Sequence, residues 1–363
     1  MLQVLRTKCG VMPLGLCTAV FCLLFVAGCV ISPRRTLGGG ATPTPTPTAS
    51  PTPTPVVATG KLYVSNGGAD SLLRFDNALT ASGNVVPAAT ISGVNTKLNA
   101  PAYITLDAAA DRLYVANKGD ISVLIFDNIS AKTGNVAPER TIVGPSTTLV
   151  TPTDVSLDKG RNLLYVADGT DIHVFASAST ATGDAAPARN LSTGFAISAI
   201  LIDGANDRLY AADQAGKAIN VYDNASTLNG PVTANRTIQG VATHLATPGG
   251  IQIDGLGRLV VSNATPSSIT IYTNAAVANG NIAPVAEISG SNTGLSFPDQ
   301  IVVNTVGNGS VYNADPGGTP RVAVFANLST ATGNIAPTRS ITGPNTGLTV
   351  AGRPVGVALD ATR

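Results

Sequence analysis

The sequence predicts an all-β protein built from six copies of one unit. Close copies of the stretch from Asp111 to Gly144, DRLYVANKGDISVLIFDNISAKTGNVAPERTIVG, recur along the chain at intervals of 45 to 52 residues. Each copy holds four short runs rich in Val, Ile, Leu, Tyr and Phe, and turn-forming residues separate these runs. Four antiparallel strands in a unit of about 50 residues are typical of a β-propeller blade.

Two positions mark the strands in every copy. The centre of the first run, LYV in most copies, lies at Tyr63, Tyr114, Tyr165, Tyr210, Val260 and Tyr312. An aromatic residue follows one strand later, at Phe75, Phe126, Phe175, Tyr222, Tyr272 and Phe325. These positions hold 11 of the 16 Phe and Tyr residues, which predicts that they form the core between blades.

Two further signals complete the unit. A Gly-Asn-x-x-Pro turn begins at Gly83, Gly134, Gly280 and Gly333, and the other two copies carry weaker versions. An apolar strand ends at Asp107, Asp158, Asp203, Asp254 and Asp360, with Asn304 in the remaining copy. A carboxylate at a strand end accepts backbone N–H groups of the following turn, so we interpret these Asp residues as structural.

The order of the strands predicts how the ring closes. The chain enters the first unit at the LYV strand, Lys61 to Ser65, without an inner strand before it. It ends just after such a strand, Val355 to Asp360. We therefore expect the last strand to complete the first blade, which removes the open sheet edges. Residues 60–363 would then form one closed six-bladed β-propeller.

The segments LYVAN, IxVFD and PxxIxLD resemble the blades of NHL-repeat and YVTN-type six-bladed propellers, and the resemblance covers residues 60–363. The resemblance implies a fold. It does not imply one function, because that group includes lactonases, peptide-processing enzymes, carbohydrate or protein binders and structural domains.

Residues 1–28 have the pattern of a signal peptide, because two basic residues precede an apolar run that ends at Gly28. The segment Val26-Ala27-Gly28-Cys29 resembles the lipobox of bacterial lipoproteins, which implies cleavage before Cys29 and lipid attachment to its thiol. Val30, as a residue other than Asp after that Cys, resembles an outer-membrane sorting signal of Gram-negative lipoproteins. The expected location is the bacterial cell envelope, outside the cytoplasm, with the lipid as the membrane contact.

Residues 29–59 are expected to form a linker. The stretch from Ala41 to Pro55 reads ATPTPTPTASPTPTP, which favours polyproline II and a length of roughly 45 Å at about 3.1 Å per residue. The remaining cysteines, Cys9, Cys17 and Cys22, would leave with the signal peptide. The mature propeller would then have no thiol for a disulfide or a metal site.

Composition and motifs exclude several function classes. Residues 60–363 carry 18 basic and 21 acidic groups and contain no basic stripe, so nucleic acid is not an expected partner. The sequence lacks a GxSxG elbow, a P-loop and a dinucleotide-binding GxGxxG segment. The two histidines, His173 and His244, lack further ligands at zinc-site spacing. The sequence therefore favours a binding protein over an enzyme.

A ring of short polar residues follows the LYV strands, at Asn66, Asn117, Asp168, Asp213, Asn263 and Asp315. Asp and Asn oxygens suit Ca²⁺. The resemblance to lactonase propellers implies an alternative function as a metal-dependent hydrolase, with Asp154, Asp168, Asp213 and Asp315 as ligands and bound water as the nucleophile. Because a turn also requires short polar residues, a structural role is the other interpretation of the ring.

Residues that break the sixfold repetition are candidates for binding. The residue before each inner strand is Tyr103, Asp154, Ala199, Gly250, Gln300 and Gly356, and three of these are not small. The aromatics outside the repeat positions and the signal peptide are Tyr103, Phe195 and Phe297, and we expect all three in the loops that lead into inner strands. Together, Tyr103, Asp154, Phe195, Phe297 and Gln300 would form a mouth for a sugar or a peptide end. Loop variation without a function is the competing interpretation.

The sequence thus predicts a membrane-anchored lipoprotein whose propeller binds a protein, peptide or glycan. The alternative is the metal-dependent hydrolase, and a third interpretation is a purely structural envelope component.

Overall fold

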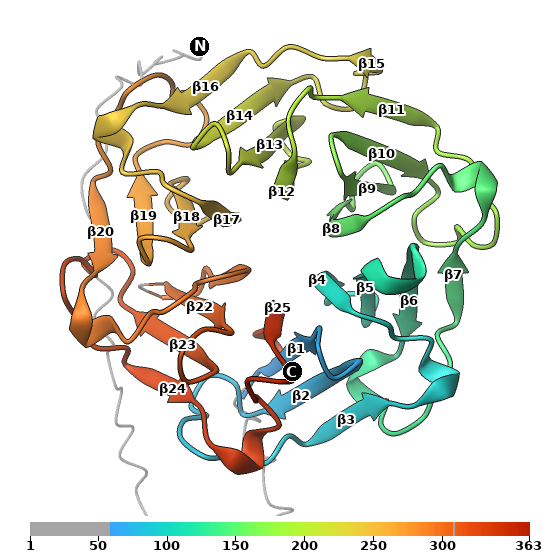
Figure 1. Cartoon of the computed structure of the whole chain (residues 1–363), viewed down its shortest axis with the longest axis horizontal. Coiled ribbons are helices and arrows are strands. Elements are labelled where there is room, and N and C mark those ends of the chain that lie inside the picture. The colour runs from blue at the N-terminus through green and yellow to red at the C-terminus, as the bar shows by residue number, and fades with distance from the viewer. Residues whose placement is uncertain (1–58, 308) are drawn as a thin grey trace, which may run out of the picture. The chain divides into compact units, whose positions relative to one another are not determined.

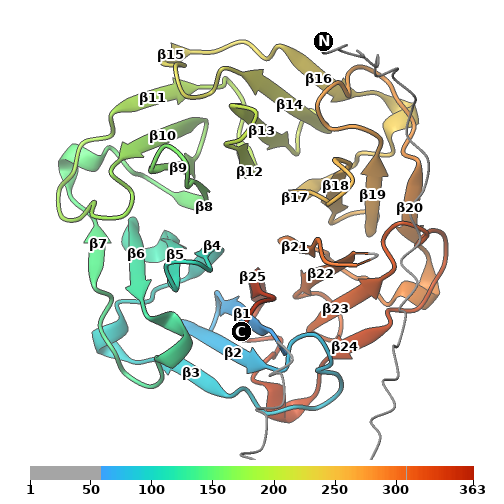
Figure 2. The same ribbon diagram turned by 180° about the vertical axis from the view of Figure 1, so that it is seen from behind.

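The strands form six small antiparallel sheets arranged in a ring around a central channel (Figure 1). The structure is a computed structural model that describes residues 59–307 and 309–363, so the predicted signal peptide and Cys29 lie outside the described residues. The view from behind shows the same ring of blades (Figure 2). The predicted six-bladed propeller is therefore confirmed. In the described part of the chain, no helix is long and apolar enough to cross a membrane.

Each blade has four main strands, numbered here from the channel outward. The innermost strands are β25 (Pro354–Asp360), β4 (Pro101–Asp107), β8 (Pro152–Asp158), β12 (Ile197–Asp203), β17 (Pro248–Ile253) and β21 (Ile301–Asn304). The second strands are β1 (Lys61–Asn66), β5 (Arg112–Asn117), β9 (Leu163–Asp168), β13 (Arg208–Asp213), β18 (Leu259–Asn263) and β22 (Ser310–Asp315).

The outer half of each blade is shorter. The third strands are β2 (Ser71–Asp76), β6 (Ser122–Asp127), β10 (Asp171–Ala176), β14 (Ala218–Asp223), β19 (Ser268–Tyr272) and β23 (Arg321–Ala326). The fourth strands are β3 (Ala89–Ser92), β7 (Arg140–Ile142), β11 (Arg189–Ser192), β16 (Arg236–Gln239), β20 (Ala286–Ser289) and β24 (Arg339–Ile341). A two-residue strand, β15 (Gly230–Pro231), pairs in parallel with β11.

Single-turn 3₁₀ helices lie in the connections. They are η1 (Val94–Thr96), η2 (Lys118–Asp120), η3 (Ile129–Ala131), η4 (Pro145–Thr147), η5 (Val241–Thr243), η6 (Ser291–Thr293) and η7 (Pro344–Thr346).

The hydrophobic core lies between neighbouring blades. Leu62 and Val64 of the first blade, for example, pack in one cluster with Tyr312 and Val322 of the sixth. All 11 aromatic residues at the two repeat positions are buried, as predicted. Burying such a side chain contributes about 1.5–3 kcal/mol, so the repetition of these residues stabilises every blade interface.

The first blade is completed by the C-terminal strand, as the strand order predicts. β25 pairs antiparallel with β1, and Lys61 lies opposite Asp360 while Asn66 lies opposite Pro354. In Figure 1 the red β25 lies beside the blue β1. The Asp residues at the inner-strand ends also act as predicted, because Asp158 accepts the backbone N–H of Arg161 at 3.0 Å and Asp254 accepts that of Leu256 at 2.9 Å.

A second set of contacts joins the blades at the periphery, and we call it the outer belt. It consists of the loops between third and fourth strands, each of which reaches the fourth strand of the preceding blade. In one of them, the Gly134 N–H donates to the Thr90 carbonyl at 2.7 Å, and Asn135 Oδ1 accepts the N–H of Asn95 in η1 at 2.8 Å.

The side-chain contact of the outer belt recurs in five copies, at Asn84, Asn135, Asp184, Asn281 and Asn334. The Gly-Asn pair of the repeated turn therefore joins blades. The remaining loop, which lacks the full Gly-Asn-x-x-Pro pattern, contains β15 and makes the same junction by strand pairing.

Candidate functional site

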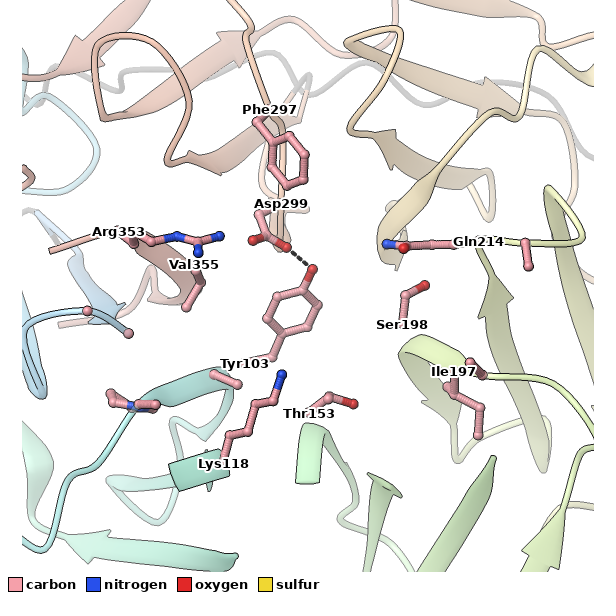
Figure 3. Close-up of a pocket in the computed structure, with 17 residues that line it drawn as sticks. Tyr103, Lys118, Thr153, Ile197, Ser198, Gln214, Phe297, Asp299, Arg353 and Val355 are labelled. Carbon is pink, nitrogen blue, oxygen red and sulfur yellow. Dashed lines mark hydrogen bonds between the residues drawn. The ribbon is translucent and has the colours of Figure 1, made fainter. Parts of the chain in front are cut away.

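The central channel opens into a hollow of about 890 Å³ on the face where second strands end, and we call this hollow the mouth. Most residues that line it are small or apolar. The charged residues of its lining are Lys118, Asp299 and Arg353, and the neutral polar ones include Thr153, Ser198 and Gln214. Figure 3 shows Arg353 and Gln214 on opposite sides, with Tyr103 and Asp299 between them.

Two positions of the repeat supply most of the polar residues of the mouth. The first residue after each second strand is Gly67, Lys118, Gly169, Gln214, Ala264 and Pro316. The position after the first residue of the inner-strand segment is Ala102, Thr153, Ser198, Gly249, Asp299 and Val355. Apart from Gly67 and Gly169, no two blades share a residue at either position, so the mouth is asymmetric although the blades are alike.

Tyr103 and Asp299 form a pair that joins the second blade to the sixth, with the first blade between them. The Tyr103 hydroxyl, from β4, donates a hydrogen bond to the Asp299 carboxylate, which directly precedes β21. Burial raises the pKa of Asp299 to about 7, although the hydrogen bond and the Arg353 charge act in the opposite direction. Burial and the neighbouring carboxylate raise the pKa of Tyr103 well above its ordinary value. Asp299 therefore changes its charge near neutral pH, while Tyr103 stays protonated and remains a donor.

Gln300 and Asp154 lie below this pair and join inner strands. Gln300 Oε1 accepts the N–H groups of Ile104 at 3.2 Å and of Val357 at 2.9 Å, and its amide donates to the Ile104 carbonyl at 3.0 Å. Asp154 accepts the N–H of Ile200 at 2.8 Å and that of Val155 at 2.7 Å. Burial raises the pKa of Asp154 to about 8. These contacts place both residues in the channel of about 220 Å³ below the mouth.

Neither cation of the mouth has a side-chain partner within the described residues. No hydrogen bond or ion pair joins the side chain of Lys118 or Arg353 to another described residue, and both residues are exposed. Arg353 has a φ of 45°, which L-residues rarely adopt. Its carbonyl accepts the N–H of Gly67 at 3.0 Å, so the loop before β25 is fixed to the turn after β1.

The structure brings only part of the predicted mouth together. Tyr103 and Phe297 line the hollow, and Phe297 is 41% exposed. Tyr103 and Asp154 lie within inner strands, where we had expected loop positions, because a register shift next to Pro101 and Pro152 turns them into the channel. Phe195 lies outside the hollow, because it packs against the core between the third and fourth blades.

The structure does not bring the predicted metal ligands Asp168, Asp213 and Asp315 together. Each lies in a different blade, and no group of three or more His, Cys, Asp or Glu in the described part of the chain is placed to hold a metal ion. Asp168 accepts the N–H of Val150 at 2.7 Å, and Asp315 accepts those of Ser296 and Phe297 at 2.8 Å.

These carboxylates therefore hold the loops of their own blades. Such an arrangement does not form one ligand set with Asp154, which lies in the channel. The Ca²⁺ site and the metal-dependent hydrolase stay predictions.

The two histidines have separate environments. His173 is buried, and its ring nitrogens lie 3.1 Å from an Asp168 oxygen and 2.7 Å from Asn190 Oδ1. His244 lies 2.7 Å from Glu287 on the surface. Neither residue lines the mouth.

Sequence reasoning missed Lys118, Asp299 and Arg353. Charged residues are common in the repeat, where they pair with one another or hold turns. The residue type alone therefore does not identify these three as part of a site. A comparison of the six copies position by position isolates them, because Asp299 is the one charged residue among its six equivalents and Arg353 is the one cation among the residues that precede inner strands.

A scan against protein families finds no match, and a search of curated proteins finds none. Solved structures do match. A chain of the nidogen/laminin complex has a TM-score of 0.56 at 14% identity, over 83% of this chain and 97% of that one. A functionally unknown protein from Desulfotomaculum acetoxidans has a TM-score of 0.53 at 12% identity, over 82% and 83%. The WD40 β-propeller domain of Doa1 has a TM-score of 0.50 at 14% identity, over 80% and 81%. These similarities show the propeller fold.

Proposed function

We propose that this chain is a membrane-anchored bacterial lipoprotein whose propeller binds a protein, peptide or glycan outside the cytoplasm through the mouth. The lipobox-like segment before Cys29 supports the anchor. The observation that carries the binding function is the asymmetry of the mouth, where an exposed aromatic ring and two cations without partners line one hollow of the size that ligand sites have.

The direction of the chain supports the same proposal. β1 runs from Lys61, at the ends of the inner strands away from the mouth, to Asn66 next to the mouth. The described chain therefore enters the propeller at the face opposite the mouth. An N-terminal anchor attached through that face leaves the mouth free for a partner.

The anchor is tested by expressing the full chain and a Cys29→Ser variant in a bacterium with labelled palmitate. We expect label and membrane fractionation for the natural chain and neither for the variant. A Cys29→Ser protein that stays in the membrane fraction would contradict lipid anchoring.

Binding at the mouth is tested with peptide and glycan arrays probed by the mature chain and by a Phe297→Ala variant. We expect a defined set of ligands that the variant loses at least tenfold. Val94→Ala is the matched control, because Val94 is 86% exposed and does not line the mouth. If the two variants behave alike, the mouth is not the binding site.

A further inference from the structure

The charge of the mouth is not balanced within the described residues. Elsewhere in the blades, several cations are paired with carboxylates, as Arg140 is with Asp127 at 2.8 Å and Arg236 with Asp223 at 2.8 Å. Lys118 and Arg353 have no such partner in the described part of the chain, yet both line the same hollow. Such cations favour an anionic ligand, and a hydrogen bond between two charged groups is among the strongest that proteins form.

The one acidic residue of the mouth, Asp299, cancels at most one of its two positive charges. Asp299 accepts the Tyr103 hydroxyl, so part of its hydrogen-bonding capacity is already used. In Figure 3 the side chains of Lys118 and Arg353 flank the Tyr103–Asp299 pair and point into the hollow. A ligand anion therefore meets the two cations and, when Asp299 is protonated, no opposing charge.

The rest of the lining selects the body of the ligand. Ala102, Ile197, Ala215, Val355 and the ring of Phe297 give the hollow an apolar wall. A glycan needs many hydrogen-bond partners, whereas only three neutral polar side chains other than Tyr103 line the mouth. A hollow of about 890 Å³ suits the end of a chain better than the flat surface of a folded protein.

We infer that the mouth binds the free C-terminal carboxylate of a peptide chain whose last side chain is apolar. This inference rests on the proposed function and names its ligand class. Lys118 and Arg353 hold the carboxylate, and the apolar wall around Phe297 receives the last side chain. The Gln214 amide, across the hollow, is available for the peptide backbone.

The backbone around Arg353 supports a preformed site. The Gly68 N–H donates to the Gly352 carbonyl at 2.9 Å, and the Arg353 N–H donates to the Thr349 carbonyl at 2.9 Å. A Cβ on Gly68 would lie 2.0 Å from the Ala351 carbonyl oxygen, so the two loops fit together only with glycine there. The backbone that carries Arg353 is therefore fixed before an anion binds, and only the side chain loses freedom on binding.

The test uses pairs of fluorescein-labelled hexapeptides that differ only in a free C-terminal carboxylate or a carboxamide. Their last residue is Ala, Leu, Phe, Lys or Asp, and binding to the mature chain is measured by fluorescence anisotropy. We expect the acid form to bind at least about tenfold more tightly than the amide, with Leu or Phe preferred at the end. Added salt should weaken the acid form more than the amide.

Variants locate the contact. We expect Lys118→Gln and Arg353→Gln each to weaken the acid form about tenfold and to leave the amide unchanged. Arg353→Lys, which keeps the charge, should restore part of the affinity. Lys97→Gln is the matched control, because Lys97 is an exposed cation on the same face that does not line the mouth. Thermal unfolding of each variant identifies any that fail to fold. If Arg353→Gln does not fold, Arg353→Lys replaces it in the comparison of acid and amide peptides.

The outcomes separate this inference from the proposed function. Equal binding of acid and amide, with loss in the Phe297→Ala variant, would overturn the inference and leave the proposed function standing. Binding of glucuronate oligosaccharides at the mouth without binding of any peptide would do the same. Failure of every peptide and glycan to bind would overturn the inference and would reduce the proposed function to the binding of a folded protein.

Discussion

The outer belt and the mouth are built from positions of the same repeat. The residues recur from blade to blade in the outer belt and differ from blade to blade in the mouth. In the outer belt, a side-chain oxygen at one repeat position accepts the same backbone N–H of the preceding blade in five copies. In the mouth, equivalent positions carry Ala102, Thr153, Ser198, Gly249, Asp299 and Val355, with no two blades alike.

The difference shows how a symmetric fold acquires one site. A contact that closes the ring is needed at every blade junction, so its residues recur. A ligand meets the ring once, so its contacts are found where the copies differ. The following predictions test whether stability resides in the repeated contacts and binding in the unique ones.

The largest effect is expected from removal of β25. A chain that ends at Gly352 lacks the strand that pairs with β1, which leaves β1 as an exposed edge. We expect the free energy of unfolding to fall by about 5 kcal/mol or more, which is comparable with the whole stability of a typical domain. We also expect aggregates in size-exclusion chromatography. A chain that ends at Asp360 is the control. A monomeric truncated chain with the natural melting temperature would show that closure is not required.

The second effect concerns the outer belt. Replacing Asn84, Asn135, Asn281 and Asn334 together by Ala leaves four backbone N–H groups without their acceptors. These sites are exposed to water, so we expect each substitution to lower the free energy of unfolding by about 0.5–1 kcal/mol. The fourfold variant should lose about 2–4 kcal/mol in total, measured by urea unfolding. Asn95→Ala and Asn345→Ala are controls in the same turns, because the outer belt uses only their backbone. A fourfold variant as stable as these controls would contradict the role of the belt.

The third prediction separates a loop-holding role from a metal-binding role for Asp168. Its oxygens accept the N–H groups of Val150 and Thr151 and contact His173. We expect Asp168→Ala to lower the free energy of unfolding by about 2–3 kcal/mol in thermal unfolding, both with and without a chelator. A melting temperature that rises with Ca²⁺ in the natural chain and not in Asp168→Ala would instead support the metal-dependent alternative.

The same residue gives a pH dependence. Burial alone would raise the pKa of Asp168, but its hydrogen bonds to His173 and to the loop backbone lower it overall. Its contribution to stability is therefore present above the ordinary pKa of Asp and is lost as pH falls through the lowered value. Asp168→Ala should remove this loss at acidic pH.

The smallest effect on stability is expected at Asp299. The pKa of about 7 in the folded chain lies above the ordinary value of Asp, so the folded state binds more protons between about pH 4 and 7. Stability should fall as pH rises through this range. At pH 8, the free energy of unfolding of Asp299→Asn in urea should therefore exceed that of the natural chain by about 1–3 kcal/mol. Tyr103→Phe should extend the pH dependence to higher pH, because it removes a hydrogen bond that lowers the pKa of Asp299. An Asp299→Asn variant with the natural pH dependence would contradict this assignment.

The fold was predictable because its determinants recur. Tyr114 and Phe126 pack between blades, and equivalent positions pack at the other junctions, so the same sequence signal occurs in each copy. Closure by the last strand also followed from the order of the strands alone. The side-chain role of the Gly-Asn pair did not, because the acceptor Asn135 and the donor Asn95 lie 40 positions apart and meet only across a blade junction.

The site was predictable only in part. Rare residue types drew attention to Tyr103 and Phe297, and both line the mouth. The pairing of Tyr103 with Asp299 depends on two residues 196 positions apart that the ring brings together. The burial of Tyr103 depends on a register shift next to Pro101, and simple strand alternation does not give the direction of a side chain after such a shift. Prediction of such contacts requires the geometry of the closed ring.

The position of β1 inside its sheet has a mechanical consequence. The carbonyls of Thr59 and Gly60 accept the N–H groups of Leu79 and Ala78, and the strand that follows is paired on both sides, with β25 and with β2. A pull along β1 through Thr59 therefore loads two antiparallel ladders in shear, and many hydrogen bonds must break together. A tether at this end transmits tension to the sheet that closes the ring, and that sheet resists it as a unit.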